Sequence, residues 1–193
     1  MHTPKSARVW DLPTDADLDR AKALASTLDL PQTAAQVLVR RGIEDDGEAS
    51  RFLTVGPADL LDPFLLAECR EAAERVQRAI DEREKIVVHG DYDADGICGT
   101  ALLTRGLRRL GANVQPFLPD RQKDGYGVAD RLVDHAADRG VSVLITVDTG
   151  STASEQLARA AAAGIDVIVC DHHRFSQRPE GVGWFLNPLR EDS

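Results

Sequence analysis

From Lys85 onward, short apolar runs alternate with longer segments of helical periodicity, and each helical segment stops at a glycine. The apolar runs predict strands at 86–89, 113–119, 141–147 and 165–170, and helices are predicted at 97–111, 127–140 and 152–164. Strands that alternate with helices of this length are typical of β-α-β units around a parallel sheet. The pattern therefore predicts an α/β fold in which a parallel β-sheet is flanked by helices.

The sequence before Lys85 predicts helices and no strands. Apolar spacing and capping residues indicate helices at 15–28, 31–42, 45–53 and 66–83. We therefore divide the chain into an N-terminal helical segment, residues 1–84, which is expected to pack on the sheet, and a sheet domain, residues 85–193. A length of 193 residues suits one domain or slightly more.

Neither a membrane nor an oxidising compartment is indicated. No apolar run approaches the roughly 18 residues that a membrane span needs, and MHTPKSARVW lacks the apolar region of a secretory signal. The three cysteines are widely spaced and odd in number, which fits neither a disulfide framework nor a paired-cysteine metal site. A cytoplasmic location with no membrane partner is expected.

Ionisable side chains follow three of the four predicted strands. They are His89, Asp91, Asp93 and Asp95 after the first strand, Asp148 after the third, and Asp171, His172 and His173 after the fourth. Ligands of open parallel sheets bind at the carboxyl ends of the strands, so these side chains are expected to face one crevice. Carboxylate oxygens suit Mg²⁺ and Mn²⁺, and mixed imidazole and carboxylate sets suit Mn²⁺, Fe²⁺ or Zn²⁺. A carboxylate that bridges two ions would make a two-metal hydrolytic site.

Each of these residues also has a structural interpretation. Asp91 could cap the helix that follows it, Asp93 and Asp95 could be solvated turn residues, and Asp148 could cap the helix from residue 152. The histidines could be structural. An EF-hand is a poor fit, because Leu102 stands at the twelfth loop position, where a glutamate is needed.

Four motifs occur in an order that resembles the DHH phosphoesterase superfamily and, within it, the RecJ single-strand-specific exonucleases. They are HGDYDADGICGTALL at 89–103, PDRQKDGYG at 119–127, VDTGS at 147–151 and DHH at 171–173. The helical segment matches as well, through RRGIEDDGEASRFL at 40–53 and DPFLL at 62–66. The resemblance therefore extends over nearly the whole chain.

The resemblance implies a two-metal site that holds Mn²⁺ or Mg²⁺. His89 and Asp93 would bind one ion, Asp95 and His172 the other, and Asp148 would bridge them. Beside this site, the family scheme implies further roles: His173 would contact the scissile phosphate, Asp91 and Asp171 would orient histidines and turn amides, and Arg121 and Tyr126 would guide the DNA strand.

The function implied is 5′-to-3′ hydrolysis of single-stranded DNA to mononucleotides in DNA repair and recombination. Single-stranded DNA is the expected partner, with a single-strand-binding protein and a RecQ-type helicase implied by the resemblance. Two alternatives stay open. One is another DHH phosphoesterase, acting on short oligonucleotides, cyclic dinucleotides or pyrophosphate, and the other is a non-catalytic replication scaffold of the same fold.

Two features of the sequence depart from this scheme. The net charge of −9 argues against nucleic acid, although carboxylates that hold cations weaken the objection. The family pattern also continues past Ser193, with a further acidic ligand and a second domain. We therefore expect residues 85–193 to be an incomplete DHH domain, and the 193-residue piece alone to bind metal weakly with little or no nuclease activity.

Overall fold

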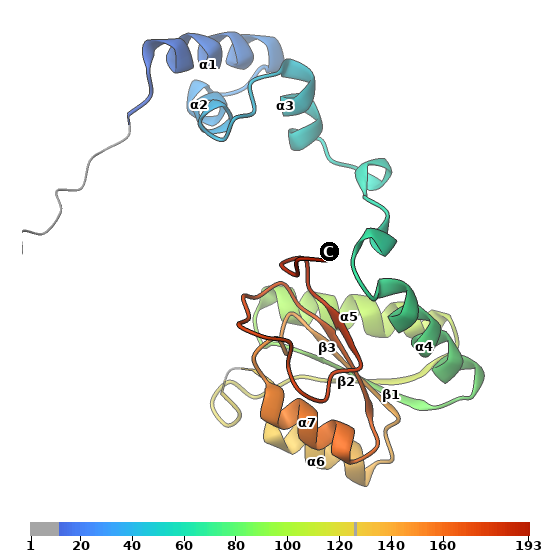
Figure 1. Ribbon diagram of the computed structural model, residues 1–193. Coiled ribbons are helices and arrows are strands. Elements are labelled where there is room, and N and C mark those ends of the chain that lie inside the picture. The colour runs from blue at the N-terminus through green and yellow to red at the C-terminus, as the bar shows by residue number, and fades with distance from the viewer. Residues whose placement is uncertain (1–11, 126) are drawn as a thin grey trace, which may run out of the picture. The chain divides into compact units, whose positions relative to one another are not determined.

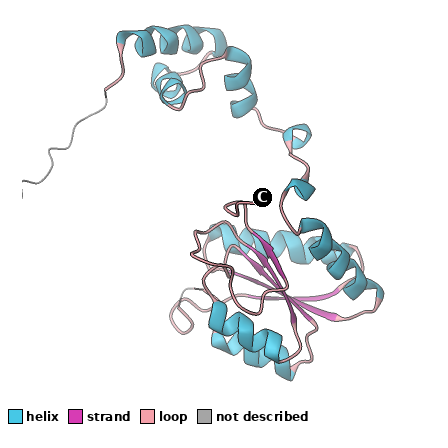
Figure 2. Ribbon diagram, viewed as in Figure 1, coloured by secondary structure: helices cyan, strands magenta, loops and turns pink. Residues whose placement is uncertain are grey.

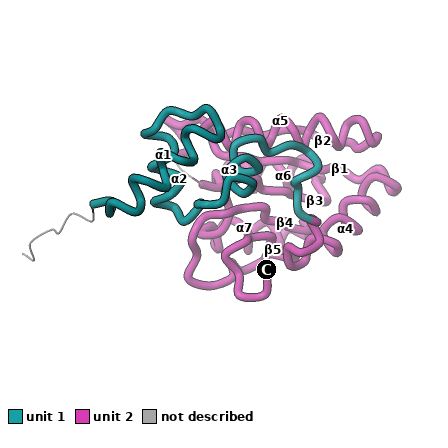
Figure 3. The backbone as a smooth tube through the Cα atoms, turned by 90° about the horizontal axis from the view of Figure 1, so that it is seen from above, with its two compact units in different colours: residues 1–61 teal, residues 62–193 magenta. Residues whose placement is uncertain are grey.

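The computed structural model describes residues 12–125 and 127–193. The chain forms two compact units that divide between Leu61 and Asp62 (Figure 3). The boundary predicted from the sequence lies at residue 84, whereas residues 62–84 belong to the compact unit that contains the sheet. The prediction that the N-terminal helical segment packs on the sheet stays a prediction.

The first unit contains three short helices whose packing forms a small core of its own. They are α1 (Asp15–Leu28), α2 (Gln32–Arg40) and α3 (Asp46–Leu53). Thr14 and Asp17 cap α1 reciprocally, each side chain accepting the other residue's backbone N–H, and Asp45 accepts the Glu48 amide at the start of α3. The small core consists of Ala21, Leu24, Ala35, Leu38, Val39 and Ala49. These helices lie close to their predicted ranges.

Two 3-10 turns and a helix lead from the first unit into the sheet. The turn η1 (Pro57–Asp59) ends the first unit, and η2 (Pro63–Leu65) and α4 (Cys69–Asp81) begin the second. The sequence predicted a helix from residue 66, but α4 begins at Cys69 because Glu68 adopts a left-handed conformation with a φ of 63°. In that conformation the Glu68 carboxylate accepts the backbone N–H of Phe185 at 2.8 Å. A contact distant in sequence therefore determines where the helix starts.

The sheet has five strands, all parallel, in the order β2-β1-β3-β4-β5. The strands are β1 (Lys85–Gly90), β2 (Asn113–Phe117), β3 (Val143–Val147), β4 (Asp166–Cys170) and β5 (Trp184–Leu186). The crossover helices are α5 (Ala94–Arg109), α6 (Asp130–Asp138) and α7 (Ser154–Ala162). The predicted α/β fold with a parallel sheet and flanking helices is confirmed. The edge strand β5 was not predicted.

Helices cover both faces of the sheet, α4 and α5 on one side and α6 and α7 on the other (Figures 1 and 2). Alternate residues of β1 enter different cores: Val87 packs with α6 and α7, whereas Ile86 and Val88 pack with α4 and α5. Because both faces are buried, the strands read as continuous apolar runs. This burial leaves the ends of the strands as the places where polar groups meet solvent.

A buried arginine joins α4 to the start of β4. The Arg75 side chain is only 4% exposed and pairs with Glu84 and with Asp166, whose side chains are 24% and 46% exposed. We expect Arg75→Met to lower the free energy of unfolding by about 2 kcal/mol, below the range for fully buried pairs because both carboxylates reach solvent. Urea unfolding measures this change. Arg78→Met is the control, because Arg78 lies on the same helix and forms no ion pair within the described part of the chain. An equal loss in both variants would contradict the expectation.

Among the described residues, no helix combines the length and apolar character needed to cross a membrane. The three cysteines are free thiols, as their spacing predicted.

Candidate metal and phosphoester site

The strands that carry the predicted site residues are neighbours in the sheet. β3 lies between β1 and β4, so the carboxyl ends of all three strands are adjacent. The chain leaves β1 to form β2 on one side and returns to form β3 on the other, which makes the gap between β1 and β3 a topological switch point. Such points are where open α/β sheets bind ligands, and the strands that carry the predicted residues end at or beside this one.

The turn after β1 depends on two glycines that let the backbone approach itself closely. A Cβ at Gly96 would lie 2.4 Å from both the N and O atoms of Asp91, and a Cβ at Gly90 would lie 2.4 Å from the Gly96 carbonyl oxygen. Within this turn Asp91 is buried, and its carboxylate accepts the Tyr92 amide at 2.7 Å. Asp91 therefore shapes the turn.

Asp93, and not Asp91, caps the helix. Its carboxylate accepts the amides of Asp95 and Gly96 at 3.1 and 3.0 Å, so α5 begins at Ala94, three residues before the predicted start near Ile97. The hydrogen bond from Gly96 lowers the pKa of Asp93 and keeps the carboxylate ionised. The cap uses one oxygen, Oδ1, which leaves the second carboxylate oxygen for another partner.

Asp148 occupies a strained position at the end of β3. Its φ is 60°, a left-handed conformation that aspartate tolerates better than most residues, and its amide donates to the Cys170 carbonyl at 2.9 Å. Burial, and then the charge of Asp93, raises the pKa of Asp148. The ionised carboxylates of Asp93 and Asp148 repel each other because they carry the same charge. A cation between them would relieve that repulsion.

The loop after β4 is organised by the buried carboxylate of Asp171. It accepts the amides of Ser151, His172 and His173, at 2.9, 2.8 and 3.2 Å, and it contacts His173 Nδ1 at 2.8 Å. Burial alone would raise the pKa of Asp171, but the hydrogen bonds from Ser151 and His173 outweigh burial and lower it. The contact between the Asp171 carboxylate and His173 Nδ1 raises the pKa of His173. This contact with Asp171 fixes the orientation of the His173 ring.

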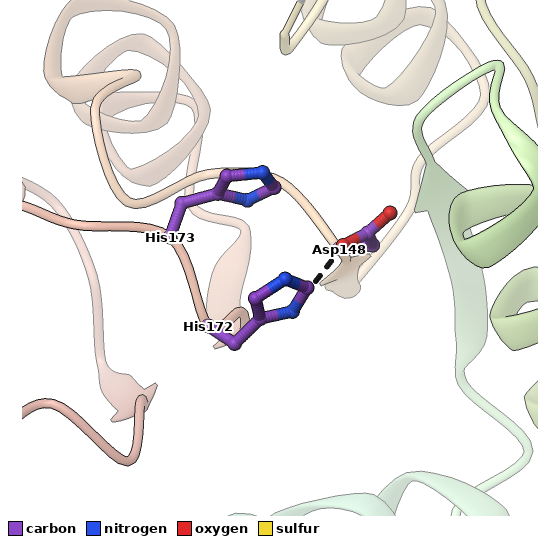
Figure 4. Close-up of side chains that lie close together, drawn as sticks. All are labelled: Asp148, His172 and His173. Carbon is purple, nitrogen blue, oxygen red and sulfur yellow. Dashed lines mark ion pairs between the residues drawn. The ribbon is translucent and has the colours of Figure 1, made fainter. Parts of the chain in front are cut away.

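Three of the predicted residues come together with ligand atoms in range of one ion. One ligand atom each from Asp148, His172 and His173 lies within 4.8 Å of the other two (Figure 4). His172 Nδ1 is 3.4 Å from Asp148 Oδ1, and the two imidazole rings stack with centroids 4.7 Å apart. The histidine side chains are 61% and 41% exposed, so they face solvent rather than the core. This donor set of one carboxylate and two imidazoles fits a divalent transition-metal cation.

Asp95 borders the same region. It lies in the first turn of α5 and lines an open pocket together with Asp148, Asp171 and His172. The carboxylates of Asp93 and Asp148 also lie close enough to share a hydrogen bond when one is protonated. The acidic residues from β1 and α5 are thus next to the cluster from β3 and β4.

His89 is placed differently. Its ring is fully buried, with Nδ1 3.1 Å from the Phe117 carbonyl oxygen and Nε2 3.4 Å from that of Gly127, and it is not among the residues of the close cluster. Burial lowers its pKa, which favours the neutral ring that a metal ligand must be. A neutral ring has one proton, and the shorter contact favours Nδ1–H, which leaves a lone pair on Nε2.

Of the two residues predicted to guide the DNA strand, the structure describes Arg121. The guanidinium of Arg121 lies over the Tyr92 ring, 5.2 Å from its centroid, which brings Arg121 to the turn that holds Asp91 and Asp93. Tyr126 lies outside the described residues.

Comparison with known proteins identifies the family. Residues 85–193, more than half of the chain, match the family described as DHH family, N-terminal domain. The chain belongs to the DHH family. Over 157 residues it is 41% identical to the single-stranded-DNA-specific exonuclease RecJ of Bacillus subtilis, a match that covers 81% of this chain and 20% of the relative.

Solved RecJ structures share the DHH fold of this chain. A crystal structure of exonuclease RecJ bound to manganese matches with a TM-score of 0.63 and 41% identity, covering 69% of this chain and 34% of that one. RecJ from Thermus thermophilus in complex with Mn²⁺ matches with a TM-score of 0.63 and 33% identity, covering 94% of this chain and 24% of that one. The chain therefore resembles the N-terminal portion of RecJ and covers no more than 34% of any of these three relatives.

Sequence reasoning missed two residues that support the DHH loop. Ser151 donates its amide to Asp171, and the fully buried Asn187 donates to the Ser151 hydroxyl and to the His173 carbonyl. The only signal for Asn187 was an Asn-Pro pair directly after the short apolar run Trp184–Leu186. That signal is weak, because Asn-Pro is an ordinary turn signal.

Proposed function

We propose that the protein is a metal-dependent exonuclease that hydrolyses single-stranded DNA from the 5′ end to mononucleotides, in DNA repair and recombination. The observation that carries the proposal is the convergence of Asp148, His172 and His173, beside Asp93 and Asp95, at three adjacent strand ends. The Mn²⁺-bound RecJ structures that share the fold support it. A phosphodiesterase needs such a cluster to bring cations and a phosphate together.

Two cations, Mn²⁺ or Mg²⁺, are proposed. His89 and Asp93 would hold one, Asp95 and His172 the other, and Asp148 would bridge them. Bound there, the cations would lower the pKa of a water molecule and neutralise charge on the phosphodiester. The cap hydrogen bonds of Asp93 and the buried position of Asp148 support the proposal, because both carboxylates are held in place before any ligand arrives.

His173 is proposed to contact the scissile phosphate. Asp171 contacts its Nδ1 and raises its pKa, which favours a positively charged imidazole beside an anionic phosphate oxygen. Asp171 and Asp91 would act through hydrogen bonds that shape the two loops. These contacts support a division of labour between residues that hold cations and residues that hold the phosphate.

The strand is proposed to run past Arg121 and Tyr126, with Arg121 contacting phosphate and Tyr126 stacking on a base. The position of Arg121 over Tyr92, beside the acidic turn, supports this path. A cytoplasmic location, a single-strand-binding protein and a RecQ-type helicase as partners, and little activity in the 193-residue piece alone belong to the same proposal.

The test uses the full-length protein with a 5′-phosphorylated single strand labelled at its 3′ end, beside duplex DNA and short RNA. With Mn²⁺ present, we expect the single strand to shorten from its 5′ end to mononucleotides while the duplex stays intact. An Asp93→Ala variant is expected to be inactive. Cleavage of short oligonucleotides, cyclic dinucleotides or pyrophosphate without cleavage of long strands would show that the protein is a DHH phosphoesterase with a different substrate. No cleavage of any substrate would support the scaffold instead.

A further inference from the structure

Asn187 is a fully buried polar residue whose side chain bonds three different segments. Its Nδ2 donates to the Ser151 hydroxyl at 3.0 Å and to the His173 carbonyl at 2.9 Å, and its Oδ1 accepts the amide of Leu189 at 2.9 Å. Both amide protons and the carbonyl are therefore used. A buried amide with all its groups satisfied keeps its partners in one arrangement, because any shift leaves a group unpaired.

Asn187 is connected to His173 in two ways, one through the backbone and one through the side chain. Asn187 holds the backbone of His173 directly. It also holds Ser151, whose amide donates to Asp171 Oδ2 at 2.9 Å, and Asp171 Oδ1 in turn contacts His173 Nδ1 at 2.8 Å. The loop that carries both histidines is thus fixed at its backbone and at its side chain through a single residue.

Asn187 is itself held by the end of β5. Leu186 pairs with Cys170 in the sheet, and the Leu186 carbonyl accepts the amide of Asp171 at 3.0 Å. On the other side, Glu68 accepts the Phe185 amide and pairs with Arg190 at 2.8 Å. The position of Asn187 is therefore supported by the sheet and by the start of α4, in addition to its own bonds to the loop.

We propose that Asn187 is a positioning residue of the metal site, acting through Ser151, Asp171 and the His173 backbone to hold both histidines toward Asp148. The proposal deepens the proposed function, since it rests on this cluster being a metal site. Loss of the two donors would let the loop depart from Asp148. Residues that orient metal ligands in this way typically change metal affinity or activity about 10- to 100-fold when they are mutated.

Two substitutions of similar volume remove the donors. Asn187→Asp keeps the acceptor for Leu189, and Asn187→Leu removes every hydrogen bond. Because the two differ in charge, an effect that they share comes from the lost donors. Val143→Ala, a buried change at the far end of β3 from Asp148, is the control for lost stability. Asn113→Asp, at the exposed start of β2, controls for the added charge.

The first measurement needs neither metal nor DNA. A long-range ¹H–¹⁵N spectrum of the metal-free chain, with His173→Gln for assignment, reports the hydrogen bond at His173 Nδ1. We expect a protected Nδ1–H in the wild type and in both controls, and its loss in both Asn187 variants. Persistence of that proton in folded Asn187 variants would overturn the proposal, and this result does not depend on whether the protein cleaves DNA.

The second measurement is Mn²⁺ affinity and strand cleavage by the full-length protein. Both Asn187 variants are expected to bind Mn²⁺ about 10-fold or more weakly and to lose kcat at saturating DNA, with little change in KM for the strand. Wild-type affinity and kcat in folded variants would refute the role. If the wild type binds Mn²⁺ but cleaves nothing, the proposed substrate fails, while an affinity difference would still support Asn187 as a positioning residue.

Discussion

Asp148→Asn is expected to reduce metal-dependent strand cleavage by at least about 1,000-fold while the chain stays folded. Asparagine has the same shape and also tolerates the left-handed conformation that Asp148 adopts at a φ of 60°. The substitution removes the charge that the proposal assigns to bridging two cations. Single-turnover cleavage with Mn²⁺, and circular dichroism for the fold, measure the two parts of this prediction.

The same substitution is expected to leave stability unchanged or to raise it at neutral pH. The pKa of Asp148 is raised by burial and by Asp93, so its ionised form is less favourable in the folded chain than in the unfolded one. Above the folded-state pKa this carboxylate destabilises the fold, and the penalty disappears as the pH falls toward the unfolded value of about 3.9. The gain in Asp148→Asn should therefore shrink toward that pH.

Two controls make the result specific. Asp148→Ala should be less stable than Asp148→Asn, because alanine is strained in the left-handed region by roughly 1 kcal/mol. Asp134→Asn, which changes an exposed carboxylate on α6, should keep full activity. Retained cleavage in Asp148→Asn, or a clear loss of stability at neutral pH, would contradict the role given to this residue.

Gly96→Ala is expected to destabilise the chain by at least about 3 kcal/mol and to abolish metal binding. An added Cβ would lie 2.4 Å from the backbone N and O atoms of Asp91, and backbone atoms cannot move aside as a flexible side chain can. The turn would have to open, which would displace both Asp91 and the cap formed by Asp93. Urea unfolding and Mn²⁺ titration measure the two effects.

The matched control lies on the same helix. Gly106 is exposed in α5, and an added Cβ would meet nothing within 4 Å among the described residues. Gly106→Ala should therefore stabilise the chain by about 0.5–1 kcal/mol, because alanine has the higher helix propensity. If Gly96→Ala proved as stable as Gly106→Ala, the close approach at Asp91 would not exist in solution.

The sequence was most informative where local pattern and topology agree. The four apolar runs became strands, and the rule that parallel strands share a carboxyl edge brought Asp148, His172 and His173 together before any contact was known. That inference did not use the order of the strands. The structure adds that β3 lies between β1 and β4, so the three strand ends are adjacent.

The features that the sequence did not reveal depend on contacts between distant segments. The helix α4 starts late because Glu68 bonds to Phe185, more than a hundred residues away. The strand β5 has three residues and forms only because β4 offers it an edge. Asn187 is ordinary as a turn residue, and its role arises from burial against Ser151 and His173. Contacts between residues so far apart in the chain cannot be predicted from the local sequence pattern.

Asp93 shows how one residue can carry two signals. Its spacing from Asp91 and Asp95 indicated a metal site. Asp91 was considered as the helix cap because the helix was predicted to start near Ile97, three residues later than α5 starts. The carboxylate that caps α5 is the one that approaches Asp148. A helix N-terminus favours an ionised carboxylate, so the cap also keeps Asp93 in the form that binds cations.

Anomalous scattering from crystals of the protein grown with Mn²⁺ would show whether this cluster holds cations. We expect manganese peaks between Asp148 and His172, next to Asp93, and the loss of those peaks in Asp148→Asn. Crystals that contain Mn²⁺ elsewhere, with no peak at the ends of β1, β3 and β4, would contradict the claim that this cluster is a metal site.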